Sequence, residues 1–159
     1  VALLSVGAES GKGNRQVRET MELLKKTGLN FVGNVEANDL TTGMVEVVVC
    51  DGFTGNVVMK LIEGLGSAMA DFLRERLDGR LSKADIHKLT SEVYDVNNVV
   101  ERHGGGPLLG VNGVSVLGHG RGNSESVRRA ITTARRTVEV GFVPSLNDEL
   151  ARVRDRMDV

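Results

Sequence analysis

The sequence has 159 residues, a length that fits one domain or one large piece of a two-domain protein. A net charge of −1 gives no global basic field, and an aromatic content of 3% without tryptophan offers little for base stacking, so nucleic acid is disfavoured as a partner. The single cysteine, Cys50, can form neither an internal disulfide nor a zinc cluster, which suits a reducing cytosolic compartment. No apolar run approaches the roughly 20 residues that span a bilayer.

The first part of the chain alternates short apolar runs with one amphipathic segment. The runs lack polar alternation, as buried parallel strands do, and they cover residues 1–6, 29–32 and 45–50. Residues 15–26 have helical periodicity, and Gly28 is placed to end that helix. Residues 36–40 predict one helical turn. The chain opens on Val1 inside an apolar run and without methionine, so we expect further sequence before it.

The second part is mostly helical. A long helix is expected from Gly55 to about Leu77, with one apolar stripe: Val58, Ile62, Leu65, Met69 and Phe72. After a break at residues 78–80, Ser82 predicts an N-cap with Asp85 as its partner. The helix that follows has a matching stripe, so the two helices predict an antiparallel hairpin; its members are Ile86, Leu89, Val93, Val96 and Val100. A fourth strand is expected over residues 111–117, and two more helices over 124–140 and 144–157, the last capped by Ser145.

Strands that alternate with helices imply βαβ units and a mostly parallel α/β sheet. On that reading four loops rich in Gly and Asn leave the carboxyl ends of strands, where open parallel sheets bind ligands. These loops are residues 11–14, 33–36, 51–56 and 119–123. Glycine lets backbone N–H groups approach a ligand closely, and helix N-termini carry partial positive charge. The loops therefore predict one anion-handling site, although each loop alone is also an ordinary turn composition.

Two named motifs are excluded by their spacing. Residues 7–13 have three residues rather than four between Gly7 and Gly11-Lys12, and Gly13 stands where a P-loop needs Ser or Thr. Residues 118–122 have the wrong third glycine spacing for a dinucleotide fingerprint. Neither ATP nor NAD is supported, and with no second cysteine or paired histidine spacing we expect no metal and no cofactor.

Several residues in the loops carry suitable chemistry, and each has a plain structural alternative. Lys12, between two glycines, can place a charge on phosphate, or it is a solvated loop lysine. Asn56 can cap a helix or hold a substrate oxygen, and Lys60 lies one turn further on. Asp51 can orient a donor or cap its loop. His119 can serve as acid, base or neutral donor, or it is a turn histidine. Cys50, ending a strand, is expected to be a packing residue.

The sequence lacks a Ser-His-Asp pattern and a Gly-x-Ser-x-Gly nucleophile elbow. If the chemistry is acyl transfer, the nucleophile is then the substrate itself. Inorganic phosphate fits because it is largely ionised near neutrality. The protein would need only to position phosphate and to stabilise an oxyanion.

Five segments together resemble one known family. They are residues 11–14, 30–36, 47–60, 105–113 and 119–123, which read GKGN, NFVGNVE, VVVCDGFTGNVVMK, GGPLLGVNG and HGRGN. In order and approximate spacing they are similar to the C-terminal half of the bacterial phosphate acyltransferase family called PlsX. The resemblance runs from Val1 to about Gly141 and treats residues 1–159 as the C-terminal part of such a protein.

The resemblance implies a three-layer, Rossmann-like α/β fold related to isocitrate and isopropylmalate dehydrogenases, with the helical hairpin protruding at about residues 55–102. It implies formation of acyl phosphate from acyl-[acyl carrier protein] and inorganic phosphate, which feeds phospholipid synthesis. Acyl carrier protein and a second identical subunit are the implied partners. The implied location is the cytosol, with peripheral association at the inner face of the membrane.

By position, the resemblance implies that Lys12 and Asn56 are the catalytic residues. The surrounding substrate and phosphate pocket is implied to comprise Gly13, Asn14, Asn34, Glu36, Asp51, Gly52, Gly55, Lys60, His119, Gly120 and Asn123. The family's N-terminal Asp-Ala-Met-Gly-Gly-Asp-like loop is absent from this sequence, so one wall of the cleft is expected to be missing and this chain alone is expected to be inactive. The polar hairpin tip at residues 78–85 disfavours membrane contact.

Two other functions fit the same sequence. A phosphotransacetylase would use acyl coenzyme A as donor with the same chemistry. Alternatively, an isolated chain would be a dimerisation and carrier-docking module, in which hairpin stripes pack against a partner and basic residues attract an acidic carrier. The basic residues are Arg128, Arg129, Arg135 and Arg136, which are otherwise a solvated helix face.

Overall fold

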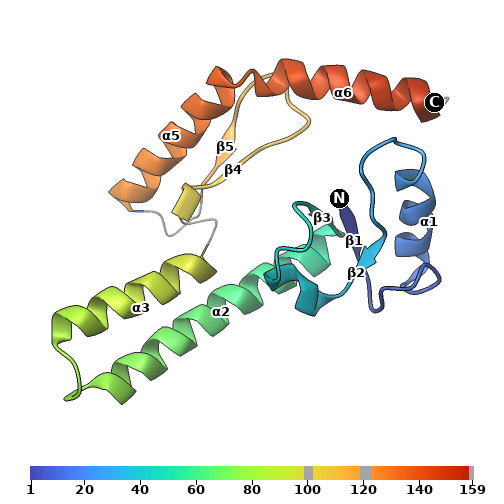
Figure 1. Ribbon diagram of the computed structural model, residues 1–159. Helices are drawn as coiled ribbons and strands as arrows, with labels where there is room; N and C mark the ends of the chain where they lie inside the picture. The colour runs from blue at the N-terminus through green and yellow to red at the C-terminus, as the bar shows by residue number, and fades with distance from the viewer. Residues whose placement is uncertain (99–101, 119–122, 158–159) are drawn as a thin grey trace. The chain divides into compact units, whose positions relative to one another are not determined.

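The computed structural model of the protein describes residues 1–98, 102–118 and 123–157 (Figure 1). Its contacts divide the chain into two compact units, one of Val1–Gly55 with Asn147–Val159 and the other of Asn56–Leu146. The fold is α/β with a parallel three-stranded sheet, as expected. In the described part of the chain, no helix has both the length and the hydropathy needed to cross a bilayer. The dehydrogenase-like three-layer arrangement and the protruding hairpin remain predictions.

The sheet of the first unit is built around its first strand. β1 (Ala2–Leu4) lies between β2 (Asn34–Val35) and β3 (Val48–Val49), and both pairings are parallel. The strands expected within residues 1–6 and 45–50 are confirmed in shortened form. The strand expected over residues 29–32 is wrong. The Phe31 N–H donates to the Leu29 carbonyl at 2.7 Å, which turns that segment, so pairing with β1 begins only at Asn34.

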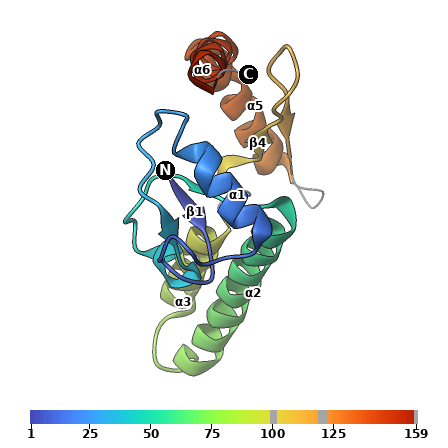
Figure 2. The ribbon, with the colours of Figure 1, turned by 90° about the vertical axis from the view of Figure 1, so that its right-hand side faces the viewer.

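α1 (Arg15–Leu24) packs on β1 in this unit (Figure 2). Asn14 caps it, because its Oδ1 accepts from the Val17 N–H at 2.9 Å, and Met21 is buried on its inner face. The predicted helix over residues 15–26 is therefore confirmed to within two residues. Beyond its end, Arg156 of α6 (Phe142–Met157) donates from Nη1 to the Thr27 carbonyl at 3.0 Å, where a cation suits the negative end of the helix.

The expected helical turn near residue 36 is confirmed as η1 (Ala37–Thr41). The loop expected over residues 51–56 is wrong, because α2 (Gly52–Leu77) already begins at Gly52. Asp51 starts it by accepting from the Thr54 N–H at 2.9 Å and from the Thr54 hydroxyl at 2.5 Å. A carboxylate at this position replaces the hydrogen bonds that the first turn lacks, and it favours the positive end of the helix.

The apolar stripe predicted on α2 is not its packed face. Leu65, Met69 and Phe72 are more than half exposed, whereas the buried residues of the helix are Gly66 and Ala70. A Cβ at Gly66 would lie 2.4 Å from the Cβ of Asn97 in α3 (Lys83–Asn97). At this position the missing side chain of Gly66 lets α2 come close to Asn97, whereas Leu65, Met69 and Phe72 are exposed.

α3 begins as the sequence predicts. Ser82 is its N-cap and accepts from the Asp85 N–H at 3.1 Å, while its hydroxyl donates to Asp85 at 2.6 Å. The predicted stripe is only partly correct, since Ile86 is buried but Val96 is 65% exposed. Val100 falls outside the described residues. Thr90 is almost fully buried instead, and its hydroxyl donates to the Ile86 carbonyl at 2.9 Å.

The fourth strand belongs to a separate antiparallel sheet. β4 (Gly106–Pro107) pairs with β5 (Val116–Leu117), and the Leu108 N–H donates to the Ser115 carbonyl at 2.7 Å. The strand expected over residues 111–117 is therefore confirmed only at Val116–Leu117, and its place in the parallel sheet is wrong. The segment between β4 and β5 is too short for the crossover that parallel strands need, so it reverses the chain.

Two further helices close the chain. α5 (Ser124–Glu139) confirms the helix expected from residue 124, and its N-cap Asn123 accepts from the Ser126 N–H at 2.9 Å. α6 (Phe142–Met157) begins two residues earlier than expected. The predicted cap at Ser145 is wrong, because Ser145 lies inside the helix and its N–H donates to the Gly141 carbonyl at 3.1 Å. Pro144 is tolerated there since the first helical turn needs no amide donors.

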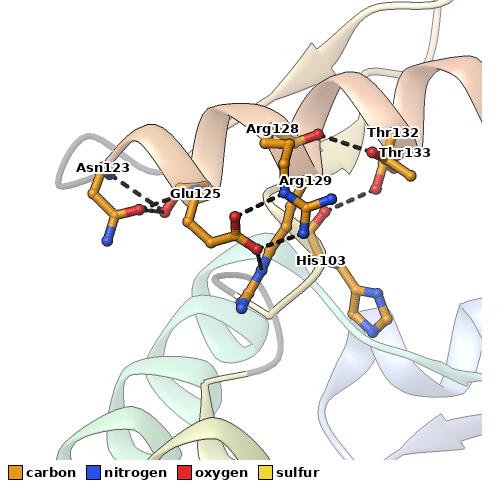
Figure 3. Close-up of polar contacts among 8 residues, drawn as sticks. His103, Asn123, Glu125, Arg128, Arg129, Thr132 and Thr133 are labelled. Carbon is orange, nitrogen blue, oxygen red and sulfur yellow. Dashed lines mark hydrogen bonds and ion pairs between the residues drawn. The ribbon is translucent and has the colours of Figure 1, made fainter.

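Glu125 forms hydrogen bonds with two arginines in the first turns of α5 (Figure 3). It accepts two hydrogen bonds from Arg128, at 2.7 and 2.6 Å, and one from Arg129 at 3.1 Å. These hydrogen bonds, chiefly those from Arg128 and next that from Arg129, lower the pKa of Glu125 from 4.5 to about 2. Further along α5, the Thr133 hydroxyl donates to the His103 carbonyl at 2.8 Å, which ties the segment before β4 to α5.

Two glycines of α2 give a matched test of the close contact with α3. Among the described residues, nothing lies within 4 Å of a Cβ at Gly64, whereas a Cβ at Gly66 meets Asn97. Gly64→Ala should stabilise the protein by about 0.5–1 kcal/mol through helix propensity. Gly66→Ala should destabilise it by roughly 1–2 kcal/mol, because overpacking outweighs that gain. Chemical denaturation of both variants checks this, and equal stabilisation would show that α2 and α3 do not touch there.

The Glu125 cluster predicts a titration. Because the folded pKa lies below the ordinary value, ionised Glu125 stabilises the start of α5 fully above pH 4.5, and this contribution is lost as pH falls through about 2. Carboxyl-carbon NMR should give a midpoint near 2, and Arg128→Gln should raise it because that side chain cannot form the same charged pair. A midpoint near 4.5 in the unsubstituted protein would contradict the cluster.

Candidate functional site

The carboxyl ends of the three parallel strands carry most of the candidate residues. β1 leads into the segment of residues 7–14, here called the Lys12 loop, while β2 leads to Glu36 and β3 to Asp51. Strands that are parallel and adjacent end at one edge, so these three segments share that edge. The expectation that all four loops leave one sheet is wrong, since the fourth follows β5 of the separate sheet.

The Lys12 loop has a defined shape. The Lys12 N–H donates to the Glu9 carbonyl at 3.0 Å, and a Cβ at Gly7 would lie 2.8 Å from the Lys12 Cγ, so the lysine stem lies across Gly7. Gly13 has a φ of 101°, and a Cβ there would lie 2.5 Å from Val17. Only glycine tolerates both the left-handed backbone and the close approach. The loop therefore presents an exposed lysine immediately before a helix.

The N-terminus of α1 adds backbone donors beside Lys12. Asn14 uses its Oδ1 to cap the helix, which leaves its amide NH₂, a donor group, as the part suited to an anion. The first turn of a helix has N–H groups without intrahelical partners and carries about half a positive charge. Together with the lysine between Gly11 and Gly13, this arrangement has the chemistry of a phosphate or carboxylate cradle.

Asn34 and Glu36 take different positions at the end of β2. Asn34 is buried, with 9% of its surface exposed, and its Nδ2 donates to the Gly7 carbonyl at 3.3 Å and to the Glu9 carbonyl at 3.1 Å. Glu36 is half-buried and precedes η1, where its backbone N–H donates to Asp39 at 2.9 Å. Asn34 thus contacts the Lys12 loop directly, whereas Glu36 begins the adjacent helical turn.

Asp51 is committed to the start of α2. The hydrogen bond from the Thr54 hydroxyl, and next that from the Thr54 N–H, lower the pKa of Asp51 below its ordinary value. Asp51 therefore stays ionised through the neutral range as a helix cap. Gly52 and Gly55 lie in the first turn of that helix, and a Cβ at Gly55 would lie 3.1 Å from the Cys50 sulfur. Cys50 itself is exposed, so the expectation that it is a packing residue is wrong.

Asn56 and Lys60 lie in the part of α2 that belongs to the second unit. Asn56 is exposed in the second turn and does not begin the helix, contrary to expectation. Lys60 is four residues further on, on the same helix face, and its ammonium forms an ion pair with Glu63 at 2.6 Å. The two side chains therefore offer an amide and a charge in one row along the helix.

The fourth candidate segment is only partly described. His119 and Gly120 lie outside the described residues. Asn123 is the N-cap of α5, and its Oδ1 accepts from both the N–H and the hydroxyl of Ser126. The basic residues considered for carrier docking are largely paired on the helix surface, with Arg128 and Arg129 on Glu125 (Figure 3) and Arg135 on Glu139 at 3.4 Å. Such exposed pairs are weak and exchange readily.

Some residues that shape the site were not indicated by the sequence. Gly7 and Glu9 contribute backbone carbonyls, which carry no residue-type signal, and Ser5 lies beneath Gly13. The Ser5 hydroxyl and the Asn34 Oδ1 are buried without a hydrogen-bond partner among the described residues. Over the same residues, no cluster of three or more His, Cys, Asp or Glu side chains is placed to hold a metal ion.

The comparisons with known proteins point in one direction. Residues 1–144 match the model of the family described as fatty acid synthesis protein. The chain is similar to a phosphate acyltransferase of Elusimicrobium minutum, with 41% identity over 162 residues that cover 98% of this chain and 46% of the relative. A phosphate acyltransferase of Nitratidesulfovibrio vulgaris is 46% identical over 143 residues, or 87% of this chain and 41% of the relative.

A phosphate acyltransferase of Desulforamulus reducens is 41% identical, with 94% of this chain and 46% of the relative covered. The chain therefore spans a little under half the length of these relatives. The motifs that resemble phosphate acyltransferases, in the Lys12 loop, at Asn34 and around Asp51, lie inside the matched region. Since the family model matches most of the sequence, the chain belongs to the fatty acid synthesis protein family.

Proposed function

We propose that the protein, at its natural full length, transfers an acyl group from acyl carrier protein to inorganic phosphate and so supplies acyl phosphate for phospholipid synthesis. The observation that carries the proposal is the Lys12 loop, which joins a lysine, a left-handed glycine and a helix N-terminus at one sheet edge. The names of the relatives, phosphate acyltransferase, support the same reaction.

The reaction requires the protein to supply positive charge and to position the substrates. An oxygen of hydrogen phosphate attacks the thioester carbonyl carbon, and the new C–O bond gives a tetrahedral oxyanion. The C–S bond then breaks, and the proton that the phosphate carried ends on the carrier thiol. Atoms and charge balance without a cofactor or a protein nucleophile. The enzyme lowers the barrier by holding phosphate in line and by stabilising the oxyanion.

The candidate residues can be assigned to these two tasks. Lys12 and the free N–H groups at the start of α1 bind phosphate, which they hold by charge and by backbone donors. The Asn56 amide donates to the oxyanion, where a positioned donor is worth far more than in water. Lys60 adds positive charge one turn along α2, partly offset by Glu63.

Apolar side chains beside the anion loops support an acyl substrate. Val6 lies two residues beyond the end of β1 and is 84% exposed, and Phe53 follows β3 in the first turn of α2 and is 81% exposed. Both stand at the carboxyl ends of adjacent strands, next to the Lys12 loop and Asp51. A substrate with a charged head and an apolar tail matches this combination, because contact with the tail removes that exposed apolar surface from water.

The partners and the location follow from the same proposal. A homodimer would cover part of the apolar surface exposed on α2 and α5, where Leu65, Met69 and Ile131 are each more than half exposed. We place the protein in the cytosol, with peripheral association at the inner face of the membrane where its product is consumed. The paired arginines of α5 remain a docking surface for an acidic carrier only if their intrahelical ion pairs open.

Substitution of the two proposed catalytic residues should separate their tasks. Lys12→Ala should raise the KM for phosphate and lower kcat/KM about 100-fold, while Asn56→Ala should lower kcat by about 100-fold with little change in the phosphate KM. Lys26→Ala and Asn38→Ala, both on the exposed surface, serve as matched controls. Acyl phosphate formation by the full-length enzyme is the assay, and full kcat/KM in both site variants would refute the assignment.

The acyl donor can be identified by direct competition. The full-length enzyme should use acyl carrier protein with a kcat/KM at least about tenfold above that for the same acyl group on coenzyme A, because the carrier adds protein contacts that contribute to transition-state binding. A preference for coenzyme A would indicate a phosphotransacetylase instead. Carrier binding without any acyl phosphate would indicate a non-catalytic docking module.

A further inference from the structure

Asn34 differs from the other candidate pocket residues in how its side-chain amide is used. It lies on β2 opposite Leu3 of β1, buried, and both of its hydrogen bonds run from Nδ2 into the Lys12 loop. The side-chain amide protons of Asn34 therefore already donate to the Gly7 and Glu9 carbonyls. The remaining polar atom, Oδ1, is an acceptor, and an acceptor repels an anion. Asn34 is thus poorly suited to bind phosphate itself.

The two carbonyls that Asn34 holds belong to residues that touch Lys12. The Glu9 oxygen accepts from Asn34 at 3.1 Å and also from the Lys12 N–H at 3.0 Å, so one carbonyl joins the two residues. The Gly7 carbonyl accepts from Asn34, and the Lys12 stem lies across Gly7, where an added Cβ would meet the Lys12 Cγ at 2.8 Å. The backbone of Lys12 is thereby tied to the sheet through one buried amide, and the Lys12 stem lies beside a glycine whose carbonyl accepts from the same amide.

We propose that Asn34 is a positioning residue, which clamps the Lys12 loop to the sheet so that Lys12 meets the phosphate. This rests on the proposed function only for the identity of the anion. Asparagine suits the task because it is short, uncharged and supplies two donors from one nitrogen, whereas aspartate supplies none when ionised. Ser or Thr would supply one donor and leave a buried carbonyl unsatisfied.

Two substitutions test the clamp without any assay of activity. Asn34→Ala removes both donors, and Asn34→Asp sets a carboxylate of the same shape against two carbonyl oxygens. In the full-length protein, hydrogen exchange of the amides in residues 7–14 should quicken about tenfold or more in both variants, because lost buried hydrogen bonds release the loop. Asn38→Asp, on the exposed surface of η1, should leave that exchange unchanged.

The Asn34→Asp variant should regain part of the clamp at low pH. A protonated aspartate can donate one hydrogen bond, so the excess exchange over the unsubstituted protein, compared at each pH, should shrink as pH falls toward 5 or below. A merely unfolded variant would show no such recovery, and circular dichroism identifies it independently. Exchange that equals that of the unsubstituted protein in both variants would overturn the proposal.

A double-mutant cycle links the clamp to the reaction. If Asn34 acts through Lys12, Asn34→Ala should raise the KM for phosphate about tenfold in the parent but change it less than twofold in a Lys12→Ala background. Effects that multiply would mean that Asn34 contacts phosphate independently and would overturn the proposal. Failure of the proposed function appears separately, as an unchanged phosphate KM in Lys12→Ala alone, whereas failure of the clamp appears as unchanged exchange.

Discussion

The parallel pairing of β1 with both β2 and β3 is the constraint on which the rest of the site depends. With β1 in the centre, the segments that follow all three strands are brought to one edge, although residues 7–14, Glu36 and Asp51 are far apart along the chain. The edge gathers Lys12, the N-terminus of α1, Asn34 and Asp51 within the first unit. Each strand is only two or three residues long, so the register given by Leu3 opposite Asn34 decides which face Asn34 occupies.

Within this edge, donors and acceptors are divided between structure and function. Asn14 and Asp51 use acceptor oxygens to cap α1 and α2, and Asn34 uses its donors to hold loop carbonyls. The exposed Lys12 side chain and the first N–H groups of α1 are left to meet an anion, although the Glu9 carboxylate lies beside Gly7 together with the Lys12 stem. The caps therefore do more than start helices, because they consume acceptors that would repel an anion and leave donors for it.

Local signals predicted the helices well and the pairings poorly. The cap at Ser82 depends on a neighbour three residues away, so the start of α3 could be placed from sequence alone. The contact of α2 with α3 depends on what Gly66 meets on another helix, and a glycine carries no apolar signal. Likewise the antiparallel pairing of β4 with β5 and the turn at Leu29 are set by backbone hydrogen bonds, which residue types do not predict. Lys12 and Asn34 could be proposed from motifs, but the Gly7 and Glu9 carbonyls that join them could not.

The proposed function requires the Lys12 loop and the start of α1 to form an anion site. A crystal structure of the full-length protein grown with phosphate shows whether they do. We expect an anion within hydrogen-bond distance of the Lys12 ammonium and of the N–H groups that open α1, with Asn34 still on the Gly7 and Glu9 carbonyls. Phosphate bound at another place, with Lys12 turned to solvent, would refute this anion site.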